Sequence, residues 1–66
     1  MNRTQATRLY HRINRQSNYN TVIRAHGSPK GPTYDIECVD PLTGIPFVVS
    51  NTADWKHRLA DAINPY

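Results

Sequence analysis

The chain has 66 residues, of which 38% are hydrophobic and 20% are charged, with a formal net charge of +3 and a single cysteine. This composition fits one folded domain, residues 1–66, near the lower size limit for folding without disulfides or metal ions, and leaves little room for an enclosed catalytic pocket. One cysteine excludes an internal disulfide, and no apolar run reaches membrane-spanning length. Because the basic N-terminus also lacks the apolar stretch of a signal peptide, we expect a soluble cytoplasmic protein with no membrane partner.

Charge is distributed unevenly along the chain. Residues 1–34 contain six basic residues and no acid, which gives +6, whereas residues 35–66 contain five acids and two bases, which gives −3; the two parts sum to the net +3. Such a split predicts a basic surface for an anionic partner, kept apart from a near-neutral half.

The first expected element is a helix over about residues 3–16. Asn2 and Gln5 have the spacing of a capping box at its start. Apolar residues then recur at i, i+3, i+4 and i+7, which places them in one narrow arc of a helix. This apolar stripe consists of Ala6, Leu9, Tyr10 and Ile13. The opposite face is expected to be basic.

Three strands are expected next. Residues 21–25 are short and β-branched, and residues 26–33 hold two glycines and two prolines, which predicts a strand followed by a loop. Residues 34–39 alternate apolar and acidic side chains, as in a strand with one wet face. Residues 40–44 have the composition of a turn, so residues 45–50 should form the return strand of a hairpin. Pro46 cannot donate to a ladder, so it should lie at an edge or a bulge.

A second helix is expected over about residues 52–63. Ser50, Asn51 and Thr52 are all suitable caps, and the apolar stripe of this helix consists of Trp55, Leu59, Ala62 and Ile63. The predicted fold is α+β, in the order α-β-β-β-α: a three-stranded antiparallel meander with both helices packed on one face of the sheet. The expected core comprises Leu9, Ile13, Ile36, Phe47 and Trp55.

The basic face of the first helix is the leading candidate for a contact site. Guanidinium groups about one turn apart can follow consecutive phosphates or bind carboxylates on a protein. The alternative is a solvated helix face that arginine keeps soluble. Lys30 lies in a Gly/Pro loop, which is either a binding element or a plain connector. The candidate contact residues are Arg3, Arg8, His11, Arg12, Arg15, Arg24 and Lys30.

Catalysis and metal binding are not indicated by any motif. The three histidines lack the spacing of a metal site, and Cys38 shares a strand face with apolar residues, as a small buried hydrophobe does. Asp35 and Glu37 share the other face of that strand, where they would act as an acid/base pair or keep the sheet soluble. We therefore expect no enzyme activity and no cofactor.

The element order and the segment from Gly27 to Tyr34 resemble those of double-stranded RNA-binding domains. This segment enters a predicted strand. The resemblance implies that the first helix and the loop before the second strand contact RNA minor grooves. The lysine cluster that this family has at the start of its last helix is not matched, because here Asp54 lies at that place. The resemblance is confined to the topology and one loop.

Three hypotheses for function follow. In the first, an arginine-rich helix face contacts nucleic acid or a nucleoprotein complex. In the second, the chain is a small protein inhibitor or adaptor, similar in style to phage-encoded inhibitors such as anti-CRISPR proteins, and it binds an acidic or nucleic-acid-binding surface of a host protein. The outline is also similar to small phage head-joining proteins. In the third, the chain assembles with itself, as in a homodimer, through a strip of Val22, Val39 and Val48. No small-molecule substrate is expected.

Overall fold

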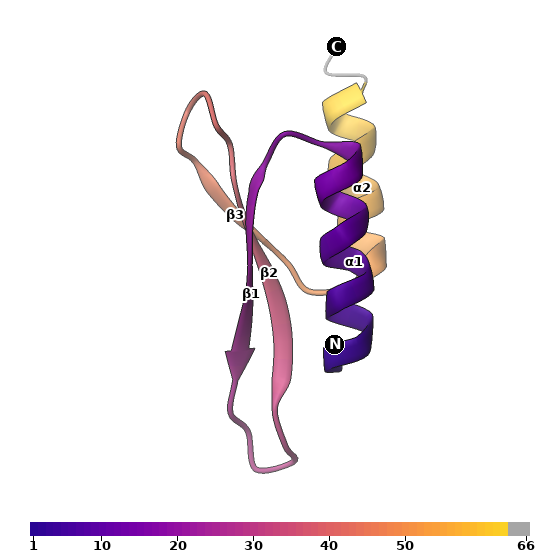
Figure 1. Cartoon of the computed structure of the whole chain (residues 1–66), viewed down its shortest axis with the longest axis vertical. Helices are drawn as coiled ribbons and strands as arrows, with labels where there is room; N and C mark the ends of the chain where they lie inside the picture. The colour runs from indigo at the N-terminus through magenta and orange to yellow at the C-terminus, as the bar shows by residue number, and fades with distance from the viewer. Residues whose placement is uncertain (64–66) are drawn as a thin grey trace.

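The structure, a computed structural model, describes the backbone of residues 1–63 and the side chains up to residue 59 (Figure 1). The elements are α1 (Arg3–Gln16), β1 (Asn20–His26), β2 (Thr33–Val39), β3 (Pro46–Val49) and α2 (Thr52–Ile63). The strands form one antiparallel sheet in the order β1-β2-β3, and both helices lie on the same side of it. The predicted fold class is confirmed.

The sheet is a meander in which each strand pairs with the next. In β1 and β2 the pairing runs from Asn20 opposite Val39 to His26 opposite Thr33, so both strands are longer than expected. β3 is shorter than expected, because Ile45 lies outside it and its carbonyl accepts a bond from the Asp40 amide at 3.2 Å. Pro46 lies at the start of an edge strand, as predicted from its missing donor.

Capping and periodicity define α1. The Asn2 side chain accepts from the Gln5 amide at 2.8 Å, and the Gln5 side chain accepts from the Asn2 amide at 3.2 Å, which confirms the capping box. Ala6, Leu9 and Ile13 are buried. The apolar stripe therefore fixes which side of α1 packs on the sheet and which side is left exposed.

The core lies between the inner face of the sheet and the two helices. Its buried members are Leu9, Ile13, Ile36, Cys38, Val49 and Trp55. Trp55 is the largest fully buried side chain, and its indole Nε1 donates to Gln16 Oε1 at 2.8 Å. This bond joins the end of α1 to α2 and satisfies the indole group away from water. Of the second helix's expected stripe, the side chains of Ala62 and Ile63 lie outside the described residues.

Two partly buried aromatic residues, Phe47 and Tyr19, pack against each other at the end of the core. Phe47, expected in the core, is only partly buried, and the Arg58 guanidinium covers its ring at 4.6 Å from the centroid. Tyr19 lies in the link between α1 and β1, where the sequence predicts a loop. Its ring packs edge-on against Phe47 at 5.0 Å and against Trp55 at 6.2 Å. Tyr19 therefore closes the end of the core.

The start of the chain is fixed to the sheet. The Tyr34 amide donates to the Met1 carbonyl at 2.9 Å, and the Met1 ammonium donates to the Tyr34 carbonyl at 3.3 Å. β3 pairs with β2 from Ile36 to Val39, so Met1 occupies the edge of β2 just beyond β3. This pairing holds the first turn of α1 against the sheet. No helix in the described part of the chain is long and apolar enough to cross a membrane.

Candidate functional site

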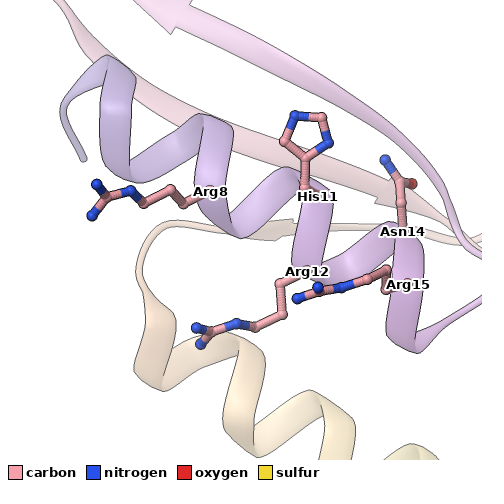
Figure 2. A pocket seen from close by; sticks show the side chains of 5 residues that line it. All are labelled: Arg8, His11, Arg12, Asn14 and Arg15. Carbon is pink, nitrogen blue, oxygen red and sulfur yellow. The ribbon is translucent and has the colours of Figure 1, made fainter.

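Arg8, Arg12 and Arg15 lie together on the exposed side of α1; we call these three residues the arginine face. All three are exposed, and they project from a helix of 14 residues. At a rise of about 1.5 Å per residue, Arg8 and Arg15 are about 10 Å apart along the helix axis. Figure 2 shows the Arg15 side chain running back along α1 toward Arg12, so the guanidinium groups gather on one side of the helix.

Two adjoining hollows border the arginine face. The larger, of about 560 Å³, is open to solvent (Figure 2). It is lined by Arg8, His11, Arg12, Asn14 and Arg15. The smaller, of about 200 Å³, is lined by Gln5, Arg8, Leu9, Arg12 and Thr52, and it lies between α1 and the first residue of α2. Arg8 and Arg12 belong to both hollows, so they stand at the junction of two neighbouring positions for a ligand.

The other flank of the larger hollow is formed by His11 and Asn14. Asn14 Oδ1 accepts a hydrogen bond from the Thr21 hydroxyl at 2.7 Å, which fixes Asn14 on the side of α1 next to β1. The His11 ring meets the Tyr10 ring edge-on at 5.5 Å. Asn14 is not among the candidate residues predicted from the sequence, although its position three residues after His11 places it on the same part of the helix.

Arg24 does not join the arginine face. It lies on the outer face of the sheet, where its Nε is 3.0 Å from Glu37 Oε2 and its Nη2 donates to Glu37 Oε1 at 3.1 Å. Two residues further along β1, His26 Nε2 lies 3.0 Å from Asp35 Oδ2. Arg24 and His26 of this face are therefore both placed against acids. Among the ion pairs formed by described residues, none involves an arginine of α1.

Arg3 and Lys30 also lie away from the arginine face. Arg3 precedes Arg8 by five residues, which is about 140° of rotation around the helix. Lys30 is exposed in the loop between β1 and β2, at the lower end of the molecule in Figure 1. In this loop the Ser28 hydroxyl donates to the Gly31 carbonyl, and Gly31 has a φ of 113°. The structure thus brings together four of the seven candidate residues: Arg8, His11, Arg12 and Arg15.

The outer face of the sheet is less apolar than expected. Val22 and Val48 are 55% and 54% exposed, but Glu37 is paired with both of them and lies between them. Val39 is half-buried in the neighbouring row, opposite Asn20 and Pro46. The expected valine strip is therefore interrupted by a carboxylate.

The other potentially reactive side chains, Cys38, Asp35 and Glu37, are buried or paired within the fold. Burial raises the pKa of the Cys38 thiol to about 11, with the Arg58 charge lowering it and the Glu37 charge raising it by less. This thiol is mostly protonated at neutral pH and is a poor nucleophile. Asp35 and Glu37 are each held by a side chain of β1, His26 and Arg24 respectively, in contrast to a free acid/base pair. Within residues whose placement is described, no group of three or more His, Cys, Asp or Glu residues could hold a metal ion.

Asp54 lies at the start of α2, where double-stranded RNA-binding domains have a lysine cluster. The Asp54 carboxylate accepts from the Ser50 amide at 3.2 Å, and the Asp54 amide donates to Asn51 Oδ1 at 2.8 Å, so this acid is part of a helix cap. No protein-family model matches the chain, and no match is found among curated proteins or solved structures. The functional argument therefore depends on the arginine face and its surroundings.

Proposed function

We propose that this protein is a non-enzymatic binding module whose arginine face contacts the phosphate groups of nucleic acid. The observation that carries the proposal is a contrast between its cations. Arg24 of the sheet lies against the Glu37 carboxylate, whereas Arg8, Arg12 and Arg15 of α1 have no such partner among the described residues. Guanidinium groups that an acid of the same chain does not occupy are available to an external anion.

The arrangement is also unfavourable for the isolated protein. Arg8 and Arg12 are an i,i+4 pair, and Arg12 and Arg15 are an i,i+3 pair, so like charges face each other twice. Each such pair on a helix costs about 0.2–0.5 kcal/mol. α1 contains no acid that would relieve this repulsion. A phosphate between the guanidinium groups would relieve it, which favours a contact role over a face that serves solubility alone.

The number of clustered arginines sets the expected salt dependence. Three phosphate contacts on a duplex give a log–log slope of about −2.7, so binding should weaken about 40-fold between about 50 and 200 mM salt. Arg24 is paired with Glu37, and Lys30 lies in the loop between β1 and β2 and not on α1, so neither is included among these three contacts.

Fluorescence polarisation with labelled DNA and RNA at these two salt concentrations tests the proposal. The variant is Arg8→Glu with Arg12→Glu, and the matched control is Arg3→Glu with Lys30→Glu, which changes the net charge equally from positions off the arginine face. We expect the first double variant to lose binding and the second to retain most of it. Equal losses would show that net charge, and not the arginine face, determines binding.

An acidic protein surface is the other partner that guanidinium groups can bind. Binding to no nucleic acid at either salt concentration would refute the phosphate proposal and direct attention to such a partner. The hypothesis of a small inhibitor or adaptor would then take its place, and the same pair of double variants would test it in a pull-down.

A further inference from the structure

We infer, on the basis of the proposed function, that the nucleic acid is double-helical and not single-stranded. The first reason is the position of the aromatic side chains. Proteins that bind single strands stack successive bases on exposed aromatic rings. No Phe, Tyr or Trp side chain in the described part of this chain is exposed.

Three of the described aromatic rings pack against one another within the fold, and Tyr10 and Tyr34 are half-buried. Tyr19 packs edge-on against Phe47 and Trp55, and Arg58 covers the Phe47 ring. Trp55 is 1% exposed. His11 is the exposed ring beside the arginine face, and a single imidazole provides no platform for successive bases. Among the described residues, a single strand would therefore find no exposed Phe, Tyr or Trp ring on which to stack its bases.

The outer face of the sheet offers no alternative platform. A sheet that binds single-stranded RNA presents aromatic residues at the centre of its exposed face. Here the central strand presents Asp35 and Glu37, and each is paired with a side chain of β1. These two side chains are neither aromatic nor basic, so they do not add to the binding of an unstacked strand.

The arginine face instead has the rigidity that suits a duplex. Its three guanidinium groups project from a capped helix, and Arg8 and Arg12 line two adjoining hollows. A duplex holds its phosphates at fixed spacings, so an array of guanidinium groups that extends roughly 10 Å along a rigid helix can meet successive phosphates of one strand. Neighbouring phosphates of one strand would occupy the two hollows.

The higher charge density of a duplex sets the size of its expected advantage over a single strand. Each phosphate contact contributes a salt exponent of about −0.9 on duplex DNA and about −0.7 on a single strand. For three contacts these exponents differ by about 0.6, so a duplex and a single strand of equal affinity at about 1 M salt differ about fourfold at about 0.1 M salt, in favour of the duplex.

The experiment compares the wild-type protein with four probes of one mixed sequence: duplex DNA, duplex RNA and a single strand of each, all with the same label. Affinities are expressed per strand, because a duplex offers two strands. We expect at least one duplex to bind about fourfold or more tightly than its own strand, with the steeper salt exponent; the two duplex arms identify the helical form. Single strands that bind equally well or better would overturn the inference while leaving the phosphate proposal intact. Binding to none of the four would refute the proposed function itself.

Discussion

Replacing Arg12 by glutamate is expected to stabilise the protein although it removes a charge that the proposed binding to phosphate requires. Arg12 lies between Arg8, four residues before it, and Arg15, three residues after it, on the exposed side of α1. The substitution converts two repulsive pairs into two attractive ones. Stability and binding should therefore change in opposite directions, which a purely structural role for this arginine does not predict.

The size of the effect follows from the two pairs. Each pair is worth about 0.2–0.5 kcal/mol in either direction, so reversing both gives about 0.8–2 kcal/mol. The lower end applies, because an acid that follows its basic partner at i,i+4 is the weaker orientation. A gain of about 1 kcal/mol raises the Tm of a domain of this size by about 4–8 °C. Arg12→Gln, which removes the repulsion without adding attraction, should give about half of this gain.

Thermal unfolding followed by circular dichroism measures these shifts at low salt and in about 1 M salt, where the screening length is about 3 Å. The gain should be present at low salt and largely absent at high salt. The reasoning is refuted if Arg12→Glu lowers the Tm at low salt, because Arg12 would then make a favourable contact within the folded chain. A gain that is unchanged in high salt would also contradict it, since the cause would not be charge.

Three further predictions concern the core. Trp55→Ala should cost about 3–5 kcal/mol in urea unfolding, a large part of the stability of so small a domain, and a cost below about 1 kcal/mol would mean that the indole is not buried as described. Gln16→Ala should cost about 1–3 kcal/mol, because it leaves the indole Nε1 without the acceptor at 2.8 Å; the same substitution in a Trp55→Phe background should cost much less, and equal costs would contradict the hydrogen bond. Burial raises the Cys38 pKa from 9.0 to about 11, so between these values the folded state keeps a proton that the unfolded state loses. The free energy of unfolding of the wild-type protein should therefore fall as pH rises from 9.0 to about 11, and that of the Cys38→Ala variant should fall less steeply over this range. Parallel curves of unfolding free energy against pH for the two proteins would contradict the raised pKa.

The two helices were predictable because their signals are local. The bounds of α1 follow from the Asn2 and Gln5 side chains, which bond to backbone groups within one turn, and its inner face follows from the spacing of the apolar residues. The same periodicity places Arg8, Arg12 and Arg15 on one outer face. No knowledge of the sheet was needed for either conclusion.

Other features depend on residues far apart in the sequence. The Met1–Tyr34 pairing joins segments 33 residues apart, and the Trp55–Gln16 bond joins segments 39 residues apart. The sequence predicts Tyr19 only as a loop residue and does not reveal its packing, because its partners, Phe47 and Trp55, lie on other elements. Such contacts arise only after the helices have packed against the sheet, so no local pattern encodes them.

The candidate site divides in the same way. By itself, the sequence determined that α1 has an arginine face, because helical periodicity alone fixes which side chains share a side. Only the tertiary structure decided which basic residues stand apart from that face. The β1–β2 register set Arg24 diagonally across from Glu37 and His26 diagonally across from Asp35, and so it placed these side chains against acids of the same sheet. Strand register is a non-local property, so no local pattern could separate Arg24 from the arginine face.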